Sequence, residues 1–272
     1  MWIASLLSGS AMSAYDTAAT WLMNTMTPSP LFLSLMSTFA TLPFFLFTLP
    51  AGVLADMFDR KRLLCFVNLW LALVAVGLAI ANGIGLANPY LILGTAFLSG
   101  IGFAFNAPAW TATIPEVVTK EDLPSATTLG GLQLNISGIV GPAIGGLVLA
   151  RLGANFVFAI NSVCFLLVIL AVSRWKSLHE ASHVPLEGFT ESLARAIDYI
   201  RQRPGVRVVV FRVSLFALFI SIIPALLPVV GLKQLNLNAS QLGFLFMSLS
   251  IGSVLGAVFV VPTVRAKFSP NK

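Results

Sequence analysis

The chain has 272 residues, of which 57% are hydrophobic and 10% are charged, and its formal net charge is +6. A soluble domain contains about 25% charged residues, so this composition excludes a soluble enzyme, a disordered chain and a secreted disulfide scaffold. The mean hydropathy is +0.93, and several apolar stretches reach the roughly 20 residues that cross a bilayer core. We therefore predict an all-α membrane protein that crosses the bilayer several times.

Eight apolar stretches follow one another along the chain, and residues typical of turns, such as Asn82-Gly83 and Asn88-Pro89, separate them. We expect the membrane spans at 2–23, 31–55, 63–81, 90–112, 125–150, 154–173, 206–231 and 240–262. The sequence thus predicts a six-helix transmembrane half over 1–173, a cytoplasmic linker over 174–205, two further helices over 206–262 and a cytoplasmic loop over 263–272.

The linker is the one long polar connection in the chain. Its apolar residues recur at helical spacing, at Phe189, Leu193, Ile197 and Ile200, and Pro204-Gly205 follows them. This pattern predicts a short amphipathic helix that lies on the membrane surface.

Basic residues are distributed very unevenly between the two sides of the membrane. If residue 1 is cytoplasmic, the outer side receives only Arg151 and Lys233 of the 16 basic residues. Cytoplasmic loops of membrane proteins carry an excess of Lys and Arg, so we expect both ends of this chain to be cytoplasmic. The basic surplus then orients the protein and contacts anionic lipid, and we expect no binding of nucleic acid.

A charged motif follows the second span: Gly52-Val-Leu54-Ala-Asp56-Met-Phe-Asp59-Arg60-Lys61-Arg62-Leu-Leu. It resembles the Gly-x-Leu-Ala-Asp-Arg-x-Gly-Arg-Lys-x-x-Leu signature of the major facilitator superfamily, which lies in the cytoplasmic loop between helices 2 and 3. Here Met57 replaces an arginine and Asp59 replaces a glycine. The resemblance implies a cytoplasmic gate with basic partners for Asp56, and Gly52 would let the second helix approach a neighbour closely. The alternative is a basic loop that only orients the chain.

The resemblance implies a fold of twelve helices in two halves with the substrate site between them, of which this chain matches helices 1–8. Residues 21–52 resemble the exporter branch called transmembrane secretion effectors, which includes enterobactin exporters. This branch implies a bacterial inner-membrane protein that exports a small amphipathic or siderophore-like compound, driven by protons, and that is a monomer when full length. The alternative is a non-transporting scaffold, remnant or partner subunit.

The fifth span contains small residues at a spacing similar to the motif associated with antiporters. The match comprises Gly141-Pro142 and Gly145-Gly146, with Ser137 where glycine is usual. Small residues permit close helix contact, and a proline removes one backbone hydrogen bond. The fragment favours export, and ordinary helix packing is the alternative.

Polar residues inside the spans are the candidates for the transport site. Asp16 is the one acidic residue well inside a span, and a carboxylate there costs several kcal/mol unless it is paired, hydrated or protonated. We expect it to couple transport to protons or to contact substrate, unless neighbouring hydroxyls or helix ends satisfy it. Amides in spans line a polar cavity or join helices by hydrogen bonds, and both interpretations apply to Asn106, Gln133, Asn135 and Asn161.

Other chemistry finds no support in the sequence. There is no glycine-rich phosphate loop, and the two cysteines, Cys65 and Cys164, lie far apart in apolar segments. His179 and His183 are four residues apart, but no third metal ligand stands in register with them. We therefore expect no catalytic residues, no metal and no cofactor.

Overall fold

A computed structural model gives the fold and describes residues 2–119, 121–174 and 189–260. Within these ranges the chain is helical and contains no strand. Six helices precede residue 174: α1 (Trp2–Met26), α2 (Pro30–Met57), α3 (Arg60–Gly83), α4 (Pro89–Val117), α5 (Leu123–Leu152) and α6 (Ala154–Ser173). The others are α7 (Phe189–Gln202), α8 (Pro204–Ile220), α9 (Ile222–Val229), the π-helical turn η1 (Val230–Gln234), α10 (Ala239–Leu255) and the π-helical turn η2 (Gly256–Val260).

Six helices in the described ranges are both long and apolar enough to cross a membrane, where the sequence predicted eight. They are α2 (over 30–48), α3, α4, α5, α6 and the segment that α10 forms with η2. Helix α1 has 25 residues, but its serines, threonines and Asp16 make it less apolar than the others. The predicted seventh span is divided. Ser221 separates α8 from α9, and α9 continues directly into η1. Helix α1 and the segment from α8 to η1 nevertheless lie where the first and the seventh spans were predicted.

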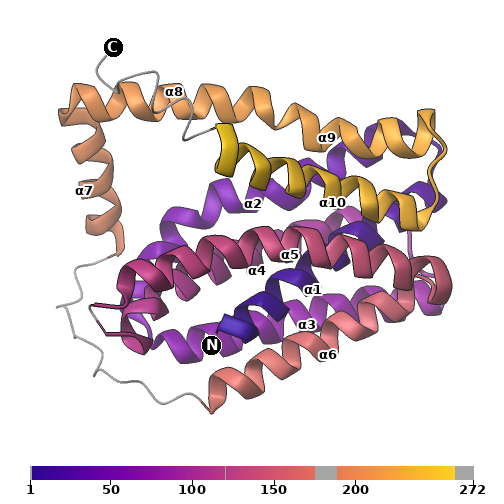
Figure 1. The fold of residues 1–272 in the computed structure, drawn as a ribbon, viewed down its shortest axis with the longest axis horizontal. Helices are drawn as coiled ribbons and strands as arrows, with labels where there is room; N and C mark the ends of the chain where they lie inside the picture. The colour runs from indigo at the N-terminus through magenta and orange to yellow at the C-terminus, as the bar shows by residue number, and fades with distance from the viewer. Residues whose placement is uncertain (1, 120, 175–188, 261–272) are drawn as a thin grey trace.

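The helices other than α7 run side by side along the long axis of the molecule, and α7 lies across one end (Figure 1). Helix α1 packs against α5 and α6, α3 packs between α4 and α6, and α2 packs against α4. Helix α10 packs on α5 and also contacts α1, and α9 packs on α2. Helix α7 coincides with the amphipathic helix predicted from its apolar spacing.

Short polar turns fix where the helices begin. Asn88 accepts a hydrogen bond from the backbone N–H of Leu91 and precedes Pro89, a pairing typical of a helix start. Asn238 and Gln241 form a reciprocal capping box at the start of α10. Gly153 has a φ of 82° between α5 and α6, a conformation that favours glycine and allows the abrupt reversal.

The largest apolar cluster contains residues from each of the helices α1 to α6 and from η1 and α10. Tyr15 packs on Phe158 with a ring-centroid distance of 5.3 Å, and Met23, Leu78 and Ile92 are completely buried in the same cluster. At the end of the bundle away from α7, the ammonium group of Lys233 in η1 donates a hydrogen bond of 3.2 Å to the backbone carbonyl of Thr27. This contact joins the helices that follow residue 188 to the end of α1.

Candidate functional site

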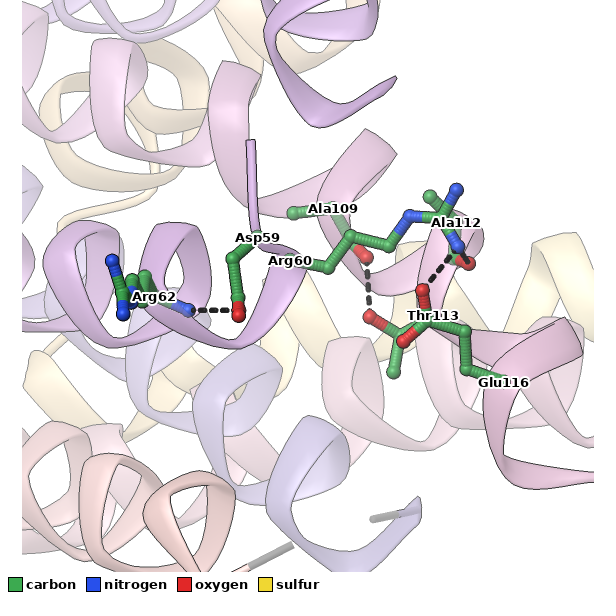
Figure 2. A network of polar contacts seen from close by, with 7 residues as sticks. All are labelled: Asp59, Arg60, Arg62, Ala109, Ala112, Thr113 and Glu116. Atoms are coloured by element: carbon green, nitrogen blue, oxygen red, sulfur yellow. Dashed lines mark hydrogen bonds and ion pairs between the residues drawn. The ribbon is translucent and has the colours of Figure 1, made fainter. Parts of the chain in front are cut away.

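The charged loop between α2 and α3 is held to the end of α4 by Arg60. The Asp59 carboxylate accepts a hydrogen bond of 3.0 Å from the backbone N–H of Arg62, so Asp59 caps α3 and Arg60 is the first helical residue. Arg60 Nη1 lies 2.5 Å from Glu116 Oε1 and donates a 2.9 Å hydrogen bond to the Ala112 carbonyl. Figure 2 shows this side chain reaching from the start of α3 to α4. The site is thus an ion pair between two helices.

The structure places the other residues of the predicted gate differently. A Cβ added at Gly52 would meet no atom within 4 Å among the described residues, and a close helix approach at Gly52 stays a prediction. The Leu54 carbonyl accepts the hydrogen bond of 2.9 Å from Phe58 N–H that ends α2. The side chain of Asp56 lies outside the described residues, and its pairing with Arg60, Lys61 or Arg62 stays a prediction.

Glu116 is a functional candidate that the sequence reasoning missed. The predicted fourth span ended at residue 112, whereas α4 continues to Val117 and brings Glu116 to the level of Arg60. A usable signal was present, because Glu116 is an acidic residue at the end of the fourth span, on the side where the basic loop lies. Side-chain exposures of 28% for Arg60 and 13% for Glu116 make this pair less screened than a surface pair.

The Arg60–Glu116 pair provides the first testable prediction. Arg60→Ala leaves the Glu116 carboxylate partly buried without its partner, so we expect a loss of about 1 kcal/mol, roughly a fivefold change in a two-state balance. Thermal unfolding of the detergent-purified protein measures this loss. The double exchange Arg60→Glu with Glu116→Arg should restore most of it. Arg62→Ala is the matched control, since Arg62 is exposed and its backbone N–H bonds Asp59. Equal losses in Arg60→Ala and Arg62→Ala would contradict the assignment.

The small residues of α5 bring two other helices close to it. A Cβ at Gly141 would lie 2.5 Å from the Ser10 carbonyl oxygen of α1, and one at Gly145 would lie 2.9 Å from Ala14 Cα. On the side facing α10, a Cβ at Gly146 would lie 2.9 Å from Gly243 Cα, and the Pro142 carbonyl oxygen lies against Gly243. The predicted close helix contact at this motif is therefore present, with α1 on one side and α10 on the other.

Asp16 lies on α1 beside this motif. Gly9, Ser13 and Asp16 share one face of the helix at spacings of four and three residues, and the first two face α5. Asp16 is half-buried, and no described residue forms a hydrogen bond or ion pair with its carboxylate. The neighbouring hydroxyl of Thr17 donates instead to the Ser13 carbonyl at 2.9 Å. The alternative in which neighbouring hydroxyls satisfy the carboxylate is therefore not what the described residues show.

The four predicted amides divide into two groups. Gln133 Nε2 donates to the Ser5 carbonyl at 3.1 Å, so it joins α5 to α1 as the helix-joining interpretation requires. Asn135 donates to the Gly131 carbonyl of its own helix at 2.9 Å. Asn106 and Asn161 are buried, and their amide nitrogens have no partner among the described residues. The role of these amides in lining a cavity stays a prediction.

A bundle of apolar helices, an ion-paired loop at one end and a half-buried carboxylate beside closely packed helices define a multi-pass membrane protein of the transporter class. A family model described as transmembrane secretion effector matches residues 1–272. The chain belongs to this efflux-type family of the major facilitator superfamily. Its members are transporters, which are generally not enzymes.

Curated relatives include several exporters. The chain is 23% identical to macrolide efflux protein A of Streptococcus pyogenes over 96% of its own length. It is 28% identical to the multidrug efflux pump Tap of Mycolicibacterium fortuitum over 94%, and 25% identical to the enterobactin exporter EntS of Escherichia coli over 76%. The matched regions span 65%, 64% and 49% of these three proteins.

A solved structure shares the fold. It is a bacterial homologue of the human lysosomal transporter Spinster, in an inward-facing and unoccupied conformation, and it superposes with a TM-score of 0.69 at 17% identity. The superposition covers 100% of this chain and 62% of that one. The predicted major facilitator fold is thereby confirmed over the region that the two chains share.

Proposed function

We propose that the intact protein is a secondary exporter that moves a small amphipathic compound out of the cell in exchange for protons. The observation that supports this best is Asp16, a half-buried carboxylate without a described partner, beside the contacts of α5 with α1 and α10. Ionisable groups inside membrane segments are rare and mark ion or substrate pathways. The relatives are exporters named for a macrolide, multiple drugs and enterobactin, which supports an amphipathic or siderophore-like substrate.

The mechanism in this proposal is alternating access. The two halves of a major facilitator transporter move against each other around a site near the middle of the membrane. Helix α5 contacts α1 within the first six helices and α10 in the segment after the linker, so it lies where such a movement changes contacts. The Arg60–Glu116 pair fixes the start of α3 to α4, and Asp56, in the last turn of α2, would then contact the other half in one of the two states.

The location and orientation also belong to this proposal. The start of α3, which contains Arg60 and Arg62, and the end of α6, which Arg174 follows, lie at the end of the bundle near α7 (Figure 1). The end of α5, which contains Arg151, and the end of α9, which η1 and Lys233 follow, lie at the opposite end. The positive-inside rule assigns the first end to the cytoplasm. We propose a monomer in the bacterial inner membrane, in contact with anionic lipids at the basic end.

Transport in inverted membrane vesicles tests the function. Vesicles that contain the intact protein should accumulate a labelled macrolide or a catecholate siderophore when respiration builds a proton gradient, and an uncoupler should stop the accumulation. Vesicles prepared with the Asp198→Asn variant, which removes an exposed carboxylate on α7, serve as a control for expression. If no compound from a panel of drugs and siderophores accumulates above empty vesicles, the exporter proposal fails and a scaffold role takes its place.

A further inference from the structure

Three polar side chains are buried together in the interior of the first six helices, away from the loops. They are Ser8 on α1, Asn68 on α3 and Asn106 on α4, with exposed fractions of 5%, 0% and 6%. Ser8 Oγ donates to Asn68 Oδ1 at 3.2 Å, and Asn68 Nδ2 donates to the Leu64 carbonyl at 2.8 Å. Asn106 Nδ2 has no partner among the described residues. The amide nitrogen of Asn106 is thus a buried donor that no described residue satisfies.

Helix packing places the three side chains at one level of the bundle. Ala4, Leu64 and Ala109 belong to one apolar cluster. Ser8 and Asn68 lie four residues, about one turn, after Ala4 and Leu64. Helix α4 runs antiparallel to α3, because Gly102 faces Leu71 while Ala109 clusters with Leu64. Asn106 lies three residues, also about one turn, before Ala109. The side chains of Ser8, Asn68 and Asn106 therefore lie one helical turn further into the bundle than the apolar cluster of Ala4, Leu64 and Ala109.

Apolar side chains also pack on the opposite side of these three polar residues. One turn further, Met12 and Leu71 belong to a second apolar cluster that includes Phe165. A Cβ at Gly102 of α4 would lie 2.6 Å from Leu71 Cδ2, so α3 and α4 are tightly packed there. The three polar residues therefore form a polar layer between two apolar clusters.

An unsatisfied amide in such a layer is costly. Leaving one buried polar group without a hydrogen bond costs about 1–3 kcal/mol, and buried polar groups in proteins obtain a partner from protein or from ordered water. The Asn106 amide offers two donors and an acceptor, while Asn68 Oδ1 and Ser8 Oγ retain free lone pairs. Buried water typically makes about three hydrogen bonds to such groups.

We propose that a water molecule binds in this layer, between the Asn106 amide and the Ser8–Asn68 pair. It accepts from Asn106 Nδ2 and donates to the free lone pairs of the pair. Asn106 lies ten residues, about 15 Å along the helix, before Glu116. The bound water thus connects the α4 segment that ends in the Arg60–Glu116 ion pair to α1 and α3, through hydrogen bonds that can re-form after small helix movements.

Radiolytic labelling in ¹⁸O-enriched water tests this site in the intact protein. A brief X-ray pulse splits bound water and oxidises nearby methionines, and mass spectrometry counts the incorporated ¹⁸O. Met12 lies one turn beyond Ser8, whereas Met23 on the same helix is completely buried in the large apolar cluster. We expect Met12 to be labelled several times faster than Met23. Equal rates in the unaltered protein would overturn the proposal, whatever the variants do.

Variants show whether the label at Met12 comes from this water. Asn106→Leu removes the amide and fills the space, so Met12 labelling should fall to the Met23 rate, and Ser8→Ala, a milder change, should lower it at least twofold. Asn135→Leu is the control, because that amide bonds within its own helix, and its labelling should equal that of the unaltered protein. Unchanged Met12 labelling in both Asn106→Leu and Ser8→Ala would show that oxidation reaches Met12 by another route, and the site would be rejected.

Discussion

Asp16→Asn in the intact protein is expected to abolish proton-driven export while leaving the protein folded in the membrane. Asparagine has nearly the same shape as aspartate but neither ionises nor carries a proton at this position. An amide also costs less inside a membrane than a carboxylate without a partner. Accumulation in energised vesicles should therefore fall to the level of empty vesicles, and movement of substrate down its own gradient should persist.

The control for this change is Asp198→Asn on α7, which removes an exposed carboxylate and should leave export unchanged. The amount of each variant in the membrane is measured by immunoblotting, so that a loss of protein is not mistaken for a loss of activity. Full proton-driven export by Asp16→Asn would refute the coupling role of this residue. Loss of the downhill movement as well would indicate that Asp16 contacts the substrate.

Gly146→Ala is expected to destabilise the packing of α10 on α5. The added Cβ would lie 2.9 Å from Gly243 Cα and 3.1 Å from the Ala239 carbonyl oxygen. Both neighbours are backbone atoms and cannot rotate away, so α10 must shift as a whole. Overpacking of this kind costs about 1–3 kcal/mol, and a chain of this size loses about 2–4 °C in Tm per kcal/mol. Thermal unfolding of the purified protein in detergent measures the shift.

Gly131→Ala is the matched control, because the same change occurs on the same helix where a Cβ meets nothing within 4 Å. Alanine favours a helix over glycine by about 1 kcal/mol, so this variant should be as stable as the unaltered protein or more so. If the two variants unfold at the same temperature, the contact between α5 and α10 does not contribute to stability in the intact protein.

The sequence predicted the helices well where hydrophobic length alone determines them. Helix α6 has its predicted limits of 154 and 173, and α5 exceeds its prediction by two residues at each end. Prediction was weaker where polar residues or prolines interrupt the apolar run. Helix α1 is less apolar than the other spans because of its serines, threonines and Asp16, and the segment from 204 to 234 contains Pro224 and Pro228 and divides into α8, α9 and η1.

The candidate site was predicted in part, and the missing part is tertiary. The charged loop was identified from residue order alone, but its ion-pair partner Glu116 lies 56 residues away from Arg60, and only the packing of α3 on α4 brings the two together. For Gln133, the residue type left two roles open, and the Ser5 carbonyl within 3.1 Å decides in favour of joining helices.

The hydrogen bond from Lys233 to Thr27 has a consequence for natural variation at the end of the bundle away from α7. Its acceptor is a backbone oxygen, which every amino acid provides, whereas its donor is a side chain that few amino acids can replace. Substitutions at position 27 should therefore be tolerated more widely than substitutions at position 233, where only arginine keeps both the reach and the positive charge. The two positions of this one contact would then change at different rates, and the hydrogen bond between η1 and the end of α1 would depend on the residue at position 233.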